Sequence, residues 1–196
     1  MMRRHKFLGG VLIACWIPTA SWAVAENFIR LGGANMEDGF GTSMTRVEVA
    51  GTGQSILLAR FLNGASCGLF HITIPDNYDA GRPEMDLILW GYADQTGGTI
   101  EFTTKMGCVG VGENYHTVSL SSGGSVLTWV APATINRVEY IAGRTDTVLT
   151  ETGCTATEHA MVEICRTAGG TNTGTFYLIG AEFQFPCGAS DSCNTP

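Results

Sequence analysis

A strict alternation of apolar and polar residues near the C-terminus constrains the fold more than any other feature. Residues 178–185 read Leu-Ile-Gly-Ala-Glu-Phe-Gln-Phe, so every second residue from Ile179 to Phe185 is apolar. A period of two is typical of a strand with one buried face, and that face needs a second sheet to cover it. We therefore expect the closing strand of an antiparallel β-sandwich. Its expected partner is the run 160–166, because the Gly-rich loop 169–174 connects the two as a hairpin.

Short apolar runs recur along the rest of the chain between turn-forming segments. Residues 85–93 are apolar on both faces, which is typical of a strand covered on both sides or carrying a binding face. Only residues 156–166 fit a helix as well as a strand, and no segment sustains a 3.6-residue period. The chain is therefore predicted to be all-β. The expected strands are 46–50, 55–62, 68–74, 85–93, 100–106 and 160–166, with shorter candidates at 118–120, 126–130, 135–141 and 147–149.

The first 25 residues have the layout of a secretory signal peptide. Three basic residues precede the apolar run 7–17, and small residues follow it. Cleavage after Ala23 or after Ala25 fits the small-x-small rule, and we expect cleavage before Glu26, where the sequence becomes polar. The segment around Cys15 also resembles a bacterial lipoprotein box, but apolar residues continue beyond it, which favours the signal peptide. Either processing route exports the chain, to a secreted, periplasmic or extracellular-surface location.

The predicted domain plan follows from this cleavage. Residues 26–44 form an extended, Gly-rich N-terminal arm, and residues 187–196 form a Cys-containing tail. The 142-residue span between them, 45–186, is of a length suited to one β-sandwich domain with its own core.

The charge of the mature chain excludes some partners. Three of the 11 Lys and Arg residues leave with the signal peptide, so 8 remain against 18 Asp and Glu, a net charge of −10. Such an acidic chain is unsuited to nucleic acid or to anionic membrane surfaces. We also expect no transmembrane segment in the mature chain.

The cysteines predict covalent staples. The mature chain holds an even number, which in an oxidising compartment allows three disulfides in fifteen connectivities. Spacing favours one pair, Cys187 with Cys193, which bracket a short flexible stretch. A zinc site is disfavoured, because no Cys-x-x-Cys occurs and no His stands at ligand spacing. The six are Cys67, Cys108, Cys154, Cys165, Cys187 and Cys193.

The order of strands and turns resembles jelly-roll β-sandwich modules of phage tail and receptor-binding proteins and of extracellular carbohydrate-binding proteins. The matching pieces are residues 72–81, 86–90, 98–102, 160–166 and 178–185. The resemblance implies a fold and a habit of surface recognition or assembly, with no catalytic residues to carry over. The six cysteines depart from the usual pattern.

Signals for catalysis are weak. The chain has no Gly-x-Ser-x-Gly, and the mature histidines His71, His116 and His159 are scattered. Glycoside hydrolysis needs two converging carboxylates, and the spacing of the candidates does not predict convergence. We expect a protein that is not an enzyme. The carboxylates considered are Glu84, Asp86, Glu101, Glu139, Glu163 and Glu182.

A calcium site is the one cofactor that the sequence suggests. Asp76, Asn77 and Asp79 supply hard oxygen ligands within four residues. The same residue types form tight turns without a metal, and this interpretation is favoured. We predict a turn here, with structural calcium as the alternative.

Aromatic residues beside polar groups suggest a ligand face. Trp90 and Tyr92 share a strand face with Asp86, and Trp129 lies farther along the chain. Sugars present C–H surfaces and hydroxyls, which suit such a face, although a sandwich core also needs large residues. We therefore predict a secreted binding or adhesion module, with a glycan or other cell-surface component as partner. The alternative is a structural subunit of an extracellular polymer or coat that self-associates through its N-terminal arm or an open sheet edge, and a secreted hydrolase is third.

Overall fold

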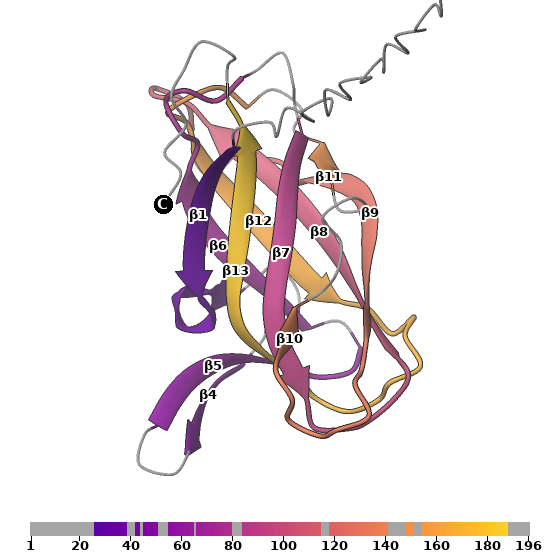
Figure 1. Cartoon of the computed structure of the whole chain (residues 1–196). Helices are drawn as coiled ribbons and strands as arrows, with labels where there is room; N and C mark the ends of the chain where they lie inside the picture. The colour runs from indigo at the N-terminus through magenta and orange to yellow at the C-terminus, as the bar shows by residue number, and fades with distance from the viewer. Residues whose placement is uncertain are drawn as a thin grey trace, which may run out of the picture.

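The alternating strands assemble into two sheets that cover each other's apolar faces, as the computed structural model shows (Figure 1). The structure describes residues 26–38, 42–43, 45–50, 55–64, 66–79, 84–114, 118–140, 148–150 and 154–187. The signal peptide, the lipoprotein alternative at Cys15 and the cysteine at 193 lie outside these residues. Within them, no helix is long and apolar enough to cross a membrane.

Sheet A contains the strand with the alternating sequence, β13. Its order is β10-β7-β13-β5-β4; β1 also pairs with β13, and β11 with β7. All of these pairings are antiparallel. The strands are β1 (Glu26–Gly32), β4 (Thr45–Ala50), β5 (Ser55–Phe61), β7 (Glu84–Ala93), β10 (Glu139–Tyr140), β11 (Val148–Thr150) and β13 (Phe176–Pro186).

Sheet B packs behind sheet A in Figure 1, where β1, β13 and β7 lie in front of β6, β12 and β8. Its order is β2-β6-β12-β8-β9, and β3 pairs with β6 in parallel. A short 3-10 helix, η1 (Gly33–Asn35), links β1 to this sheet. The strands are β2 (Glu37–Asp38), β3 (Thr42–Ser43), β6 (Ser66–Thr73), β8 (Thr99–Val109), β9 (Ser121–Val130) and β12 (His159–Arg166).

The path of the chain between the sheets defines a jelly roll. Strand β5 lies in sheet A, β6 in B, β7 in A, β8 and β9 in B, β10 in A, β12 in B and β13 in A. The resulting four-strand sets, β5-β13-β7-β10 and β6-β12-β8-β9, are those of two interleaved Greek keys. The predicted all-β, antiparallel jelly-roll sandwich is confirmed.

Aromatic side chains from both sheets fill the core. Phe183 of β13 contacts Phe70 of β6 edge-to-face, with ring centroids 5.5 Å apart, and both rings are fully buried. Phe176 contacts Trp129 in the same way, at 5.2 Å. Burying one such side chain stabilises the fold by about 1.5–3 kcal/mol, so these inter-sheet contacts hold the layers together.

The predicted partner of β13 is wrong. Strand β13 pairs with β7, β1 and β5, whereas the run 160–166 belongs to β12 and pairs with β6 and β8 in the other sheet. The loop between them crosses the sandwich instead of closing a hairpin, because the buried Arg166 holds it there. Its guanidinium donates hydrogen bonds to the carbonyls of Asn172 (2.8 Å), Gly174 and, across in β5, Phe61 (3.0 Å).

A β-bulge interrupts the alternation in β13. The register against β7 shifts between Leu178 and Gly180, so Ile179 has no partner across the ladder. Leu178 and Ala181 consequently both face the core and are fully buried. Ile179, predicted to share that face, is only partly buried. The rest of the predicted pattern, with Phe183 and Phe185 in the core, holds.

The first described residues are part of sheet A. Strand β1 pairs with β13 over its whole length, from Glu26 opposite Pro186 to Gly32 opposite Gly180. This segment of the predicted N-terminal arm therefore adds to the sheet of its own chain.

Disulfides staple sheet B and one end of the sandwich. Cys67 of β6 bonds to Cys165 directly opposite it in β12, across 98 residues of sequence. Cys108 of β8 bonds to Cys154, across 46 residues, and this loop is nested inside the first. Cys187 is also disulfide-bonded, and its predicted partner lies outside the described residues.

Candidate functional site

The outer face of sheet A carries aromatic and polar side chains in rows that run across the strands. Residues directly opposite each other in antiparallel strands share a face. One row therefore joins Tyr140 of β10, Trp90 of β7, Gly180 of β13 and Gly32 of β1. We call this row the strip. In Figure 1 the outer face of β1, β13 and β7 is turned toward the viewer.

A pair of tyrosines borders the strip on one side. Tyr92 and Tyr177 lie opposite each other in β7 and β13, and their rings stack with centroids 4.9 Å apart and planes 16° apart. Burial, followed by the neighbouring Tyr177 and Asp94, raises the pKa of the Tyr92 phenol above its ordinary value. The phenol is therefore a neutral hydrogen-bond donor at physiological pH.

A hydrogen-bonded carboxylate borders the strip on the other side. Glu182 accepts a hydrogen bond from Arg30 Nε at 2.6 Å and another from Gln184 Nε2. The Glu182 side chain is 5% exposed and that of Arg30 is 59% exposed, so the pair reaches from the sheet surface into solvent. The buried Oε1 of Gln184 has no hydrogen-bond partner within the described part of the chain. Arg30 is therefore the exposed polar group of this cluster.

The structure brings together three of the four predicted ligand residues. Asp86 lies opposite Gln184 on β7, on the same face as Trp90 and Tyr92. The fourth, Trp129, does not belong to this face. It is 2% exposed and packs in the core, because β9 points it inward opposite Ile100 of β8.

Sequence reasoning missed Tyr177 and Arg30. Tyr177 comes before the bulge, so its side of the strand does not follow from the alternation of residues 181–185. A glycine within a strand is a known sign of a bulge, and Gly180 was the available signal. Arg30 lay in a segment with no strand pattern of its own.

The candidate calcium residues lie in a turn closed by backbone hydrogen bonds. The Tyr78 amide donates to the Pro75 carbonyl at 3.2 Å, and the Asp79 amide donates to the Pro186 carbonyl at 3.0 Å. Asp76 is exposed and Asn77 half-buried. The turn is as predicted, and calcium binding to Asp76, Asn77 and Asp79 stays a prediction.

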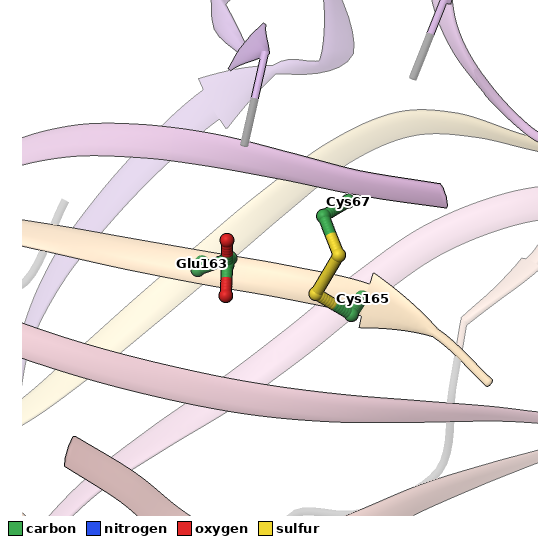
Figure 2. Close-up of side chains that lie close together, drawn as sticks. All are labelled: Cys67, Glu163 and Cys165. Carbon is green, nitrogen blue, oxygen red and sulfur yellow. A yellow bond between two sulfur atoms is a disulfide. The ribbon is translucent and has the colours of Figure 1, made fainter. Parts of the chain in front are cut away.

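Two clusters have the residue types of metal sites, but their cysteines are disulfide-bonded. Figure 2 shows Glu163 beside Cys67 and Cys165, whose sulfur atoms are joined in a disulfide. The second cluster places Glu158 beside the disulfide of Cys108 and Cys154. A disulfide sulfur is not a thiolate, and the thiolate is the metal ligand.

Four of the remaining carboxylate candidates are divided between the two outer faces. Glu101 and Glu163 alternate with core residues on sheet B, whereas Asp86 and Glu182 lie on sheet A. His71 Nδ1 lies 3.0 Å from His159 Nε2 on sheet B. Burial, followed by His71, lowers the pKa of His159, so this ring tends to be neutral.

No family model matches the sequence, and no curated protein matches it. Among solved structures, the isomalto-dextranase of Arthrobacter globiformis T6 complexed with panose is 16% identical, with a TM-score of 0.52. The match covers 80% of this chain but only 23% of that enzyme.

Two carbohydrate-binding modules also match. The CBM36-1 domain of a multidomain xylanase from the hindgut metagenome of Trinervitermes trinervoides is 12% identical, with 83% of this chain and 100% of that chain covered and a TM-score of 0.45. A CBM36 module in complex with calcium and xylotriose is 12% identical, with 79% and 98% covered and a TM-score of 0.43. Carbohydrate-binding modules, which the sequence-based resemblance names, are thus among the structural matches.

Proposed function

We propose that this chain is an exported, non-catalytic module that binds a glycan on the outer face of sheet A. The observation that carries the proposal is the aromatic surface formed by Tyr140, Trp90, Tyr92 and Tyr177, which spans β10, β7 and β13. Tyr140 is 62% exposed, and Trp90, Tyr92 and Tyr177 are each partly exposed. A core role does not account for four aromatic side chains on the outer side of one sheet.

The polar cluster complements this surface chemically. A sugar ring packs its C–H face on an aromatic ring and directs its hydroxyls sideways. The exposed Arg30 guanidinium, held in place by the buried Glu182 carboxylate, donates hydrogen bonds to such hydroxyls. The acidic chain favours neutral glycans over polyanionic ones.

The disulfides support an exported module. Cys67–Cys165 and Cys108–Cys154 form and persist in oxidising compartments such as the periplasm and the extracellular space. This agrees with the signal peptide predicted in residues 1–25.

The test is a glycan array with the mature protein, repeated with Trp90→Ala. Loss of the indole removes at least about 1.5 kcal/mol of apolar burial, or roughly tenfold in Kd. Thr128→Ala, at an exposed position on the outer face of sheet B, is the matched control and should bind like the wild type. Absence of binding to every sugar, or equal binding by Trp90→Ala, would contradict the proposal.

A further inference from the structure

We propose that the glycan lies across the strands along the strip, so that the ligand is an internal segment of a linear, unbranched chain. This inference rests on the proposed function and adds the direction and length of the bound sugar. It follows from the order of side chains in three neighbouring rows of sheet A.

The half of the strip over Gly180 and Gly32 has no side chains, and it lies between two rows that have them. The middle row, Tyr140, Trp90, Gly180 and Gly32, has side chains only in its first half. The row toward one end of the strands contains the stacked tyrosines, and the row toward the other contains Glu182 with Arg30. A ligand that starts on Trp90 and continues over the glycines therefore passes between hydroxyl-bonding groups on both sides.

Packing requires glycine at one of the two glycine positions of the strip but not at the other. At Gly180 a Cβ atom would lie 2.9 Å from the Leu31 carbonyl oxygen, so the close approach of β1 requires glycine there. Gly180 is buried by its neighbours, so a ligand would contact those neighbours. Without a side chain at position 180, the ligand can lie closer to the sheet.

Packing does not require glycine at position 32. Its backbone angles, φ −71° and ψ 153°, are open to any residue. A Cβ atom would meet only Asn35 Oδ1 at 3.5 Å and the Ile179 carbonyl at 3.9 Å, which are ordinary contacts. The missing side chain at this exposed position leaves the end of the strip clear.

The dimensions of the strip suit several sugar rings. Four strands at their usual spacing make it about 14 Å long, which exceeds one sugar ring. Tyr140 at one end and Gly32 at the other are both exposed. A longer chain can therefore extend past both ends, as an internal segment of a polysaccharide must.

The test places a side chain at the glycine end. Gly32→Leu should keep the fold, and calorimetry would then compare it with the wild type on linear glucan, xylan and dextran oligosaccharides, from monosaccharide to hexasaccharide. We expect wild-type affinity to rise at least tenfold with length and Gly32→Leu to lose that gain while binding disaccharides normally. Tyr140→Ala, at the other end, should also reduce the gain. Thr128→Leu on sheet B should bind like the wild type.

The outcomes separate the two proposals. If Trp90→Ala abolishes binding but Gly32→Leu and Tyr140→Ala match the wild type at every length, the path across the strands is wrong and the glycan site stands. If none of the oligosaccharides binds the wild type, the proposed function fails and the strip with it. If Gly32→Leu melts well below the wild type, the Tyr140→Ala series alone decides.

Discussion

Removal of the disulfide between Cys67 and Cys165 should destabilise the protein through its unfolded state. In the folded state β6 and β12 remain paired over seven residues without the bond, so the double variant Cys67→Ala/Cys165→Ala keeps its native contacts. In the unfolded state the bond closes a loop of 98 residues, within which the 46-residue loop of Cys108 and Cys154 is nested. With the inner bond intact, chain entropy assigns the outer bond about 4 kcal/mol.

That loss is large for a small domain, whose total stability is about 5–15 kcal/mol. Equilibrium unfolding in guanidinium chloride measures it, with the fluorescence of the buried Trp129 as a core probe. The slope of the transition should also steepen, because the unfolded variant exposes more surface. The matched variant Cys108→Ala/Cys154→Ala should lose about 3.5 kcal/mol, since its loop is shorter and stays within the outer one.

A specific result would refute this reasoning. If the outer variant loses less than about 1 kcal/mol with an unchanged slope, the bond does not restrict the unfolded chain as loop-closure entropy requires. If the outer variant loses much more unfolding free energy than the inner variant, local packing around Cys67 contributes to the stability as well.

Three further predictions concern single groups. Arg166→Met should lower the free energy of unfolding, measured in urea, by about 3 kcal/mol or more, because it leaves the carbonyls that Arg166 binds without donors. A loss below about 1 kcal/mol would contradict that role. Because the pKa of His159 is lowered in the fold, its contribution to stability should be full above pH 6.5 and should be lost as the pH falls from there through the lower pKa of the folded state. Thermal melts should show a flatter profile for His159→Gln. EDTA should leave the melting temperature unchanged, because backbone hydrogen bonds close the turn at Asp79. If EDTA lowers the melting temperature by several degrees, and calcium but not magnesium restores it, the alternative calcium site is present.

Alternation in the sequence identified the core faces and much of the candidate site. Phe183 and Phe185 point inward as predicted, and Trp90 and Tyr92 share the outer face with Asp86. These inferences succeeded because successive side chains in a strand must point to opposite sides.

The neighbours of each strand could not be predicted in the same way. An apolar face does not specify which strand lies alongside, so β13 was assigned to β12 although the bonds of Arg166 carry the loop into the other sheet. The burial of Trp129 was missed because β9 is apolar on both sides around it, with Val126 and Val130 exposed and Leu127 buried. Where both faces of a strand are apolar, alternation does not identify the buried face.

The bulge at Ile179 has a consequence for natural variation and for engineering. Before it, the even-numbered Phe176 and Leu178 face the core; after it, the odd-numbered Ala181 and Phe183 do. Deleting Ile179 itself would leave a regular strand in which both halves still face the core, whereas a deletion elsewhere in the strand, with the bulge kept, would turn the apolar side chains of one part to solvent. Away from position 179, insertions and deletions should therefore be rare in residues 176–186, and a binding face grafted from a sandwich without a bulge must be shifted by one residue on one side of that position.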